Sequence, residues 1–514
     1  MPLIPISKLG SKTAYVVILL AALASLADVA ADSAVINNLT LLDGYVEFYN
    51  LDAALLGLNV AITSVGYVIA GPFSGDILDR IGRVKAMMVG SILTIVSVAI
   101  SGSAPVEAAF VVGRFLLGVS MAISATASTL YVAELAPPQH RQTLIGILIG
   151  LSGFIVTFFT LSVLGLYGLR TMWAWRGFVL SELIAPLIGL VLLLFAPETP
   201  RWLISKGRTD EALEILAVLH AKGDRNNELV KLEFQEICAT IDAEKSVHSS
   251  WKGLLTPAPN LRRFGICLLS SIFYQMLGAG NLLYFMSILL QNLGIQSMKN
   301  IILINWGLGI WNTCAMMFGG WFLDRVGRKS TLVYSTIIMS ICMLVIGLLQ
   351  RQLEFGVTLG LSVGAVITIF IYQFVASMGW QILAYSYPNE ILAFSQRAKG
   401  SALTQSVGYA FSFVYLYCFP IALETIAWKF FVLNSCWSLA FAVVIWFVFV
   451  ETKGKTLEEI DELFEGNGAV TMGIHPHQDL EDSLSEVGSS NLNDKIIAQT
   501  TVDGTIKDNK VTGL

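Results

Sequence analysis

Twelve long apolar stretches are the feature that most restricts how this chain of 514 residues can fold. Each comes close to the roughly 20 residues that a helix needs to cross the hydrocarbon core of a bilayer. Only 13% of the residues are charged, about half the share in soluble domains, so a soluble fold would lack a polar surface. Backbone groups within a bilayer must bond inside their own segment, which predicts an all-α integral membrane protein. The predicted spans are 13–36, 55–78, 85–103, 107–133, 142–166, 174–196, 263–292, 300–323, 331–349, 355–386, 400–424 and 427–450.

Charge and cysteine content exclude several other classes of protein. The 32 Lys and Arg residues are outnumbered by 37 Asp and Glu, so the net charge is −5 and no basic face for nucleic acid is predicted. The six cysteines show no paired spacing, and neither a disulfide framework nor a zinc site is expected. The sequence contains no nucleotide-binding loop and no HExxH motif. No metal, cofactor or enzymatic activity is therefore predicted.

The basic residues also predict the orientation of the spans. With both termini in the cytoplasm, most Lys and Arg fall in cytoplasmic segments, as the positive-inside rule requires. The first span resembles a signal peptide in position, but it contains Asp28 and Asp32 and lacks a clear cleavage site, so we expect it to be retained. Asn38 begins an Asn-Leu-Thr sequon on the predicted outer side and is a candidate glycosylation site, although its nearness to the membrane argues against its use.

The spans and the segments between them predict five regions. Residues 1–12 are a cytoplasmic N-terminus, and residues 13–196 are a first bundle of six helices. Residues 197–262 are a cytoplasmic loop with short helices, and residues 263–450 are a second bundle of six. Residues 451–514 are a cytoplasmic tail, predicted to be largely disordered because most of it is rich in Gly, Ser, Asp and Asn.

Three short motifs occur twice, about 250 residues apart, which indicates an internal repeat. GDILDRIGR ends at Arg83, and GWFLDRVGR ends at Arg328. A Glu precedes an Arg by seven residues at Glu134 and again at Glu390. Pro-Glu-Thr at 197–199 and Val-Glu-Thr at 450–452 close the two halves. Two similar halves around a central loop are typical of a transporter that opens alternately to either side, with the substrate between the halves.

These motifs resemble those of the sugar porter family of the major facilitator superfamily. The DRxGR loop alone is typical of the superfamily, whereas the sequence PETPRW at 197–202 indicates sugar porters. The resemblance covers about residues 13–465 and is strongest to fungal proton-coupled hexose and disaccharide permeases, including the lactose permease-like branch. It implies two six-helix bundles in the plasma membrane, with a sugar, a proton and the lipid bilayer as partners.

The resemblance also implies a gate on the cytoplasmic side. The charged motifs fall at predicted cytoplasmic ends of helices, where a charge stays hydrated while its partner lies on a neighbouring helix. One exposed ion pair contributes only about 0–1 kcal/mol, so several together suit a gate that must both hold and open. The alternative is that these charges only set the topology. The expected gate residues are Asp79, Arg80, Arg83, Glu134, Arg141, Glu198, Arg201, Asp324, Arg325, Arg328, Glu390, Arg397 and Glu451.

Charges inside the spans cost about 2.5–3.5 kcal/mol each and are therefore candidates for function. Asp32 lies in a segment similar to the family's first-helix motif, whose Asp carries the coupled proton. Arg114 matches the family's Gly-Arg motif in the fourth span and is the expected partner. An Arg that approaches or leaves a carboxylate changes its affinity for a proton. The alternative is a static ion pair. Asp28 and Glu182 also lie within spans, and both functional and structural roles stay open for them.

The seventh span carries part of the family's sugar-binding pattern. Amides of Gln and Asn bind sugar hydroxyls, and aromatic rings cover the apolar faces of a sugar. Gln275, Tyr284 and Phe285 fit the pattern, whereas Tyr274 replaces the first Gln. Asn281 stands one place late, which is about 100° of rotation on a continuous helix.

Other expected sugar-site positions also depart from the family. Asn312 matches a binding Asn in the eighth span, but Ile149 stands at the fifth-span Gln. Tyr385 replaces the tenth-span Trp, and Gly408, Tyr409 and Ser412 replace a polar cluster in the eleventh span. Fewer amides suit a less hydroxylated, or bulkier and flatter, substrate than a plain hexose; ordinary helix packing is the alternative for the aromatic residues. The expected site is Gln275, Asn312, Tyr274, Asn281, Tyr284, Phe285, Tyr385 and Tyr409.

The sequence therefore predicts a secondary active transporter for a hexose or disaccharide that works by proton symport. Two alternatives stay open. The missing amides favour a transporter for another small organic compound, such as an organic acid or a specialised metabolite. A membrane sensor that uses the same fold to signal is disfavoured, because the cytoplasmic tail after Glu451 is short and contains no obvious folded domain.

Overall fold

The structure is a computed structural model, and the part of it that can be described is helical throughout. Eleven helices in this part are long and apolar enough to cross a membrane. The shorter α7 (Arg141–Ser162), apolar over Gly150–Gly165, corresponds to the remaining predicted span. The predicted all-α class with two six-helix bundles is confirmed. The described residues are 10–136, 141–166, 171–246, 256, 258–356, 358–392, 397–453, 460 and 464.

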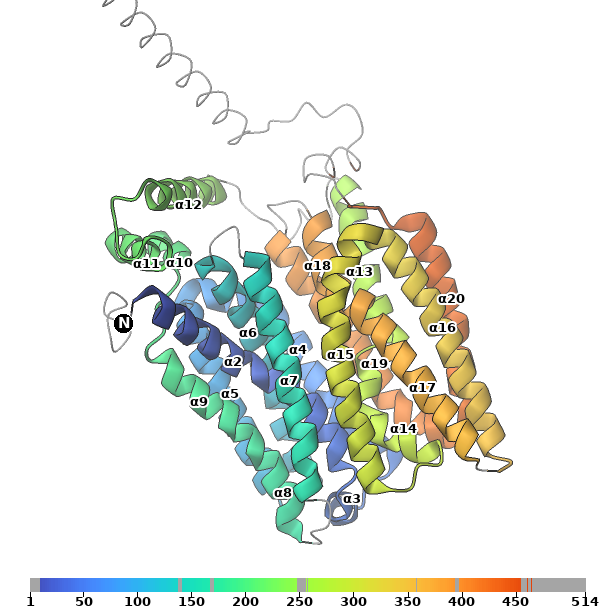
Figure 1. The fold of residues 1–514 in the computed structure, drawn as a ribbon. Coiled ribbons are helices and arrows are strands. Elements are labelled where there is room, and N and C mark those ends of the chain that lie inside the picture. The colour runs from blue at the N-terminus through green and yellow to red at the C-terminus, as the bar shows by residue number, and fades with distance from the viewer. Residues whose placement is uncertain are drawn as a thin grey trace, which may run out of the picture. The chain divides into compact units, whose positions relative to one another are not determined.

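The first half begins at α2 and ends at α9 (Figure 1). Its helix ends follow from local chemistry. The carboxylate of Asp52 accepts the backbone N–H of Leu55 at 2.7 Å and caps the start of α4. Gly82, at φ +96°, makes the turn from α4 into α5. The elements are α2 Ser11–Leu39, α3 Asp43–Tyr49, α4 Ala53–Ile81, α5 Arg83–Ser103, α6 Glu107–Leu135, α7, η2 Val163–Gly165, α8 Met172–Leu180, η3 Ser181–Leu183 and α9 Ile184–Leu193.

The second half repeats this order of helices. Gly327, at φ +99°, makes the turn between α15 and α16, as Gly82 does between α4 and α5. The elements are α13 Ala258–Leu277, η5 Asn281–Phe285, α14 Met286–Asn292, α15 Met298–Val326, α16 Arg328–Leu353, α17 Leu359–Val375, η6 Ala376–Trp380, α18 Gln381–Ile391, α19 Arg397–Thr425 and α20 Trp428–Val448.

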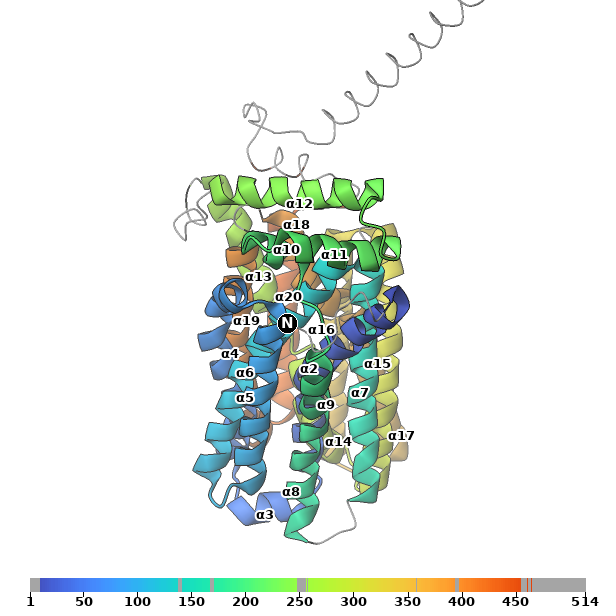
Figure 2. The same ribbon diagram turned by 90° about the vertical axis from the view of Figure 1, so that its left-hand side faces the viewer.

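Three shorter helices follow α9 and lie across one end of the bundle, opposite α3 (Figure 2). They are α10 (Pro200–Ser205), α11 (Thr209–Ala221) and α12 (Glu228–Ser246). His220 of α11 links this layer to the bundle, because one ring nitrogen lies 2.6 Å from Glu233 of α12 and the other 3.4 Å from the carbonyl of Leu135, at the end of α6. Nearly all of the predicted tail lies outside the described residues.

Three of the predicted spans are interrupted. A 3₁₀ turn, η3, separates α8 from α9, and a π-helical turn, η6, separates α17 from α18. The seventh span is broken after α13, where Gly278 adopts φ +79° and a 3₁₀ segment follows. Such interruptions are tolerated within a membrane where protein rather than lipid surrounds the backbone.

The side chains are sorted as a bilayer requires. Buried positions hold many small polar residues, such as Ser97, Ser120 and Ser124, whereas exposed positions on the spans are apolar, such as Phe158 and Phe447. Small residues let helices approach closely, which favours association in lipid. The lipid-facing surface is thus apolar, whereas the interior combines apolar side chains with small polar ones.

The two halves meet along two pairs of helices, α4 with α19 and α7 with α15 (Figure 1). A Cβ on Gly57 of α4 would lie 2.6 Å from the carbonyl oxygen of Tyr417 on α19. At the same end of the bundle, the backbone N–H of Ser287 donates to the side chain of Asn37 at 2.8 Å. The halves are therefore in close contact at the end where α3 lies.

The contact between α4 and α6 gives a test of this packing. A Cβ on Gly118 would clash with the carbonyl oxygen of Thr63, whereas one on Gly75 of α4 would meet nothing within 4 Å. We expect Gly118→Ala to lower stability by about 1–3 kcal/mol through overpacking. Gly75→Ala should be neutral or stabilising, because Ala favours a helix. Thermal unfolding of the purified proteins in detergent measures both, and equal melting temperatures would contradict so close an approach of α4 and α6.

Candidate functional site

A buried ion pair lies inside the first half. Asp32 is on α2 and Arg114 on α6, and their side chains are 0% and 4% exposed. The guanidinium donates from Nη1 to Oδ1 of the carboxylate, and its Nη2 lies 3.3 Å from Oδ2. Its Nε donates to the carbonyl oxygen of Asn59 on α4 at 3.1 Å. The structure thus brings together the two residues that the sequence motifs indicated for proton coupling.

This ion pair has neighbours from both halves. Glu182 of η3 and Arg114 line a cavity of about 10 Å³, room for one water molecule. Arg114 interacts electrostatically with Glu182 as well as with Asp32, so one cation faces two carboxylates. Tyr284, from the second half, also interacts electrostatically with the pair. A movement of one half against the other would therefore change the surroundings of the pair. The side chain of Asp28 lies outside the described residues.

Aromatic residues gather where α4 meets the second half. The rings of Tyr67 on α4 and Tyr409 on α19 stack with centroids 3.8 Å apart and planes 20° from parallel. Tyr409 shares a side-chain hydrogen bond with Tyr385 on α18, and Tyr385 meets the ring of Tyr274 edge-on at 6.5 Å. Tyr385 is 44% exposed although α18 packs against α13 and α19. Its ring therefore borders open space.

The break in the seventh span decides the role of Asn281. Its Nδ2 donates to the carbonyl oxygen of Gln275 at 3.1 Å, and its Oδ1 accepts from the hydroxyl of Ser412 on α19 at 2.9 Å. The rotation expected on a continuous helix does not apply, because Gly278 ends the helix before this residue. Asn281 is therefore placed by the 3₁₀ segment, and it ties that segment to α19.

Two other amides have unused capacity for hydrogen bonds. Gln275 of α13 is 5% exposed, and its side chain makes no hydrogen bond to the residues described. Asn312 of α15 has a buried Oδ1 with no partner in this part of the chain. A buried amide group without a partner is costly, so such groups are suited to bind a polar ligand.

One residue of the expected sugar site lies elsewhere. Phe285 is 1% exposed, and its ring packs against that of Phe419, with centroids 5.3 Å apart. It belongs to the apolar core of the second half in this structure, and its place in the substrate site stays a prediction. The irregular segment η5 places Tyr284 near the ion pair and its neighbour Phe285 in the apolar core.

At the end near α10–α12, an acidic residue caps a membrane helix of the first half. The carboxylate of Glu198 accepts the N–H of Arg83 at 2.9 Å and that of Val84 at 3.2 Å, at the start of α5. A helix N-terminus favours negative charge at this position. Burial raises the pKa of Glu198, although these N–H groups and Arg83 act in the opposite direction. A Cβ on Gly82 would clash with the carboxylate of Glu198, so a glycine is needed there.

The side chain of Arg83 extends the same cluster. Its guanidinium lies 2.9 Å from Glu134 Oε1 on α6 and 3.1 Å from Asp79 Oδ1 on α4. The indole of Trp202, in α10, donates to the backbone carbonyl of Asp79 at 3.1 Å. One arginine thus ties the ends of α4, α5 and α6 together.

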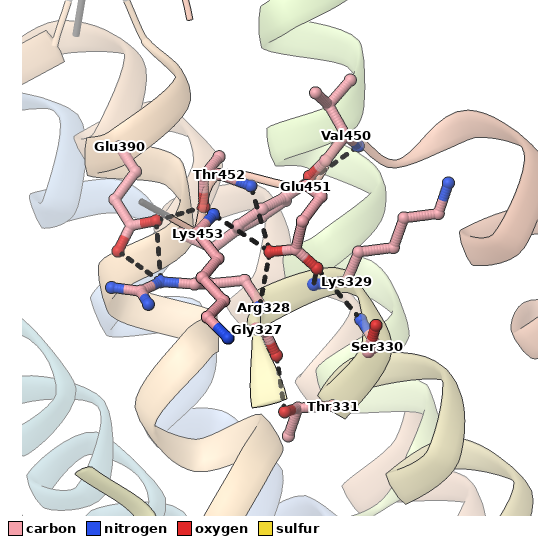
Figure 3. Close-up of polar contacts among 11 residues, drawn as sticks. Gly327, Arg328, Lys329, Ser330, Thr331, Glu390, Val450, Glu451, Thr452 and Lys453 are labelled. Atoms are coloured by element: carbon pink, nitrogen blue, oxygen red, sulfur yellow. Dashed lines mark hydrogen bonds and ion pairs between the residues drawn. The ribbon is translucent and has the colours of Figure 1, made fainter. Parts of the chain in front are cut away.

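The second half repeats this arrangement (Figure 3). The carboxylate of Glu451 accepts the N–H of Arg328 at 2.8 Å and that of Lys329 at 3.0 Å, at the start of α16. The Nε of Arg328 lies 3.3 Å from the carboxylate of Glu390 on α18. Thr452 also donates its hydroxyl to Glu390. Glu451 therefore matches Glu198, and Arg328 matches Arg83.

These contacts join helix ends within one half. The expectation that the charged motifs pair across helices is met inside each half, where the ion pairs of Arg83 and Arg328 fasten neighbouring helices rather than one half to the other. Arg80 is exposed, and Arg325 lies over the ring of Trp321 at 4.1 Å. Arg201 is partly exposed. The side chains of three further expected gate residues lie outside the described residues, namely those of Arg141, Asp324 and Arg397.

Two tyrosines that the sequence motifs did not single out belong to these clusters. The hydroxyl of Tyr131 donates to the carbonyl oxygen of Pro197 at 2.8 Å, and that of Tyr387 donates to the carbonyl oxygen of Val450 at 2.7 Å. Each lies three residues before the Glu of its half. The repeat that revealed Glu134 and Glu390 therefore also carried the signal for Tyr131 and Tyr387.

The candidate glycosylation site does not fit the folded chain. Asn38 lies in the last turn of α2 and is 0% exposed. Its Nδ2, the atom that would carry the glycan, donates to the carbonyl oxygen of Ala34 at 2.7 Å. A glycan at this atom has no room, so this expectation was wrong for the folded protein.

Comparison with known proteins agrees with this architecture. The family described as "Sugar (and other) transporter" matches residues 12–464. The high-affinity glucose transporter of Kluyveromyces lactis is 26% identical over 465 residues, which cover 86% of this chain and 82% of the relative. The arabinose-proton symporter of Bacillus subtilis is 27% identical over 432 residues, 81% of this chain and 88% of the relative. An inward-open structure of the E. coli xylose transporter XylE has a TM-score of 0.73 at 24% identity and covers 88% of this chain and 100% of that one, which shows a shared fold.

The capping role of Glu198 and Glu451 can be measured. We expect Glu198→Ala and Glu451→Ala each to cost about 1–3 kcal/mol of stability, because buried N–H groups lose their acceptor. The exposed Glu424 provides a matched control as Glu424→Ala. Thermal unfolding of the full-length variants in detergent checks this, and a pair of variants as stable as the control would contradict the caps.

Proposed function

The chain belongs to the sugar (and other) transporter family, and on this premise we propose that it moves a hexose or disaccharide across the plasma membrane by proton symport. Three observations support this proposal. The chain is a multi-pass membrane protein built from two similar halves. A buried carboxylate lies beside the boundary between the halves. Two amides of the second half, Gln275 and Asn312, have free hydrogen-bonding capacity.

The proposed orientation places α10–α12 and the charged helix ends in the cytoplasm. Both termini then lie on that side, as the basic residues of the sequence predict. The close contact near α3 is on the outer side in this orientation. The charged clusters keep each half rigid at its cytoplasmic end, so that the halves move as bodies. We propose that they act as a gate by this rigidity.

The ion pair of Asp32 and Arg114 carries the proposal of proton coupling. A charged carboxylate that is 0% exposed is costly without a partner, and Arg114 is the partner of Asp32. If movement of the second half draws Arg114 toward Glu182, Asp32 is left without its partner and takes up a proton. Tyr284 connects this event to the second half, since it interacts with both members of the pair. Movement and protonation are thereby linked.

The charges near the site favour a neutral substrate over an organic acid. Arg114 is bound to Asp32 and also faces Glu182, so it offers no spare positive charge to a carboxylate ligand. The amides Gln275 and Asn312 instead suit hydroxyl groups. Of the relatives, the yeast protein is named a glucose transporter and the bacterial one an arabinose-proton symporter. A neutral sugar is the class that these features support.

We expect Asp32→Asn to abolish uphill uptake driven by a pH gradient while sugar counterflow stays measurable. The reason is that an amide cannot take up the proton that the gradient supplies. Asp210→Asn is the matched control, because Asp210 is an exposed acid on α11, outside the spans. Uptake of labelled sugar into reconstituted vesicles, with and without a pH gradient, makes the measurement. Unchanged accumulation in Asp32→Asn would remove this residue from the mechanism.

We expect Gln275→Ala and Asn312→Ala each to raise the apparent KM for the sugar about two- to tenfold, the value of one lost hydrogen bond. The control is Gln352→Ala, which changes an exposed amide on α16. Initial uptake rates, normalised to the amount of protein in the vesicles, give the KM values. Normal KM in both variants would show that these amides do not bind the substrate.

A further inference from the structure

The stack of Tyr67 on Tyr409 has no role in the function proposed so far. It joins the two halves near the middle of the bundle, because Tyr67 lies midway along α4 and Tyr409 midway along α19. Tyr67 is 7% exposed, so its ring is enclosed at this boundary. Nothing in the repeat motifs points to it.

The geometry of this stack is set by the helices that carry it. Aromatic pairs prefer centroids 4.5–7 Å apart in offset or edge-on arrangements, whereas these rings face one another at 3.8 Å. The helices are held close on both sides of the stack. A Cβ on Gly57 would meet the carbonyl oxygen of Tyr417 at 2.6 Å, and one on Gly71 would meet the hydroxyl of Ser406 at 2.5 Å. The two rings are thus pressed together when the halves meet.

Separation of α4 from α19 would turn this pair into a slot. Each half would then present one flat ring to the space between them, and in the closed pair the planes of these rings lie 20° from parallel. A planar ring fits such a slot better than a chair-shaped sugar, since it contacts both walls over its full area. The rings of Tyr385 and Tyr274 lie at the second-half side of this space.

The second half contributes polar side chains that could bind the rest of a ligand held by the slot. Gln275 is free to bond hydroxyl groups, and Tyr385 adds a hydroxyl at the edge of open space. Of the amides, Asn281 is occupied by Ser412 and by the backbone, so fewer groups remain for a fully hydroxylated ligand. A ligand that consists of a sugar and a flat apolar ring fits both features, because the amide binds the sugar and the slot holds the ring.

We propose that Tyr67 and Tyr409 are the two walls of a slot that binds an aromatic ring attached to a neutral sugar, so that the preferred substrate class is aryl glycosides. This inference rests on the proposed function, since it assigns the substrate of the same transport site. Tyr67 is a substrate-contacting residue in this proposal. In this proposal Tyr67 separates from Tyr409 when the substrate enters the site.

The test compares three neutral ligands that differ only at one end. Purified full-length protein in vesicles with an imposed pH gradient is given glucose, methyl glucoside and 4-nitrophenyl glucoside, the glucosides in both anomeric forms. We expect the nitrophenyl compound to half-saturate uptake at a concentration about tenfold below that of glucose or methyl glucoside, the factor that one additional aromatic contact supplies. Tyr67→Ala should raise this concentration about tenfold for the nitrophenyl compound and at most about threefold for glucose.

Two further variants separate the ring from the fold. Tyr67→Phe keeps the ring and should keep the preference for the nitrophenyl compound. Tyr334→Ala removes an exposed tyrosine of α16 and should transport all three ligands like the unchanged protein. If Tyr67→Ala is poorly folded, the Phe variant and the ligand series still decide the question.

The outcomes distinguish this inference from the proposed function. Gradient-driven uptake of glucose without any preference for the nitrophenyl compound would overturn the aromatic slot and leave sugar transport intact. Equal losses for glucose and nitrophenyl glucoside in Tyr67→Ala would also overturn it. If none of the three ligands is taken up in response to the pH gradient, the proposed function itself fails.

Discussion

A charge in the interior of a membrane protein has no water to stabilise it, and the ion pair of Asp32 with Arg114 shows how this chain meets that constraint. The two side chains come from different helices and are almost completely enclosed. Replacing either residue would leave the other as a buried charge without a partner, which costs far more free energy than an exposed charge does. The helices α2 and α6 are therefore held in a defined relation, and α4 joins them through the carbonyl of Asn59. Tyr284, which reaches toward the pair from the second half, makes it sensitive to the position of that half.

The same constraint explains where the helices are broken. A helix that lies against lipid cannot give up its backbone hydrogen bonds, but one surrounded by protein can. The seventh span is broken at Gly278, and the side chain of Asn281 donates a hydrogen bond to the carbonyl of Gln275, which the break leaves without its helical partner. The break also separates the directions of two adjacent side chains, since Tyr284 faces the ion pair and Phe285 the apolar core. A site between two halves thus depends on an irregular segment that only protein contacts can stabilise.

The charged motifs at the end of the bundle near α10–α12 act at the ends of membrane helices. Glu198 and Glu451 each accept backbone N–H groups at the start of a membrane helix, and each lies just after the last span of its half. These acids therefore tie the last span to the third one, while Arg83 and Arg328 tie the third span to the fourth. Each half becomes a body that can move as a unit. Rigid halves are what an alternating movement about a central site requires.

The resemblance to the sugar porter family implied the pairing of Asp32 with Arg114, whereas the lengths of the apolar stretches and the spacing of repeated motifs predicted the twelve spans and the two halves. The same motif spacing also indicated that Arg83, Glu134 and Glu198 lie at one helix end, because a repeated motif marks equivalent positions in both halves. The side-chain contacts between neighbouring helices could not be predicted in this way. The positive φ of Gly278, the inward turn of Asn281, the burial of Asn38 and the stack of Tyr67 on Tyr409 all depend on residues far away in the chain. Local sequence determines which segments become helices and which faces are apolar, whereas the close packing of one helix on another selects the side chains that meet, and that selection is a property of the whole fold.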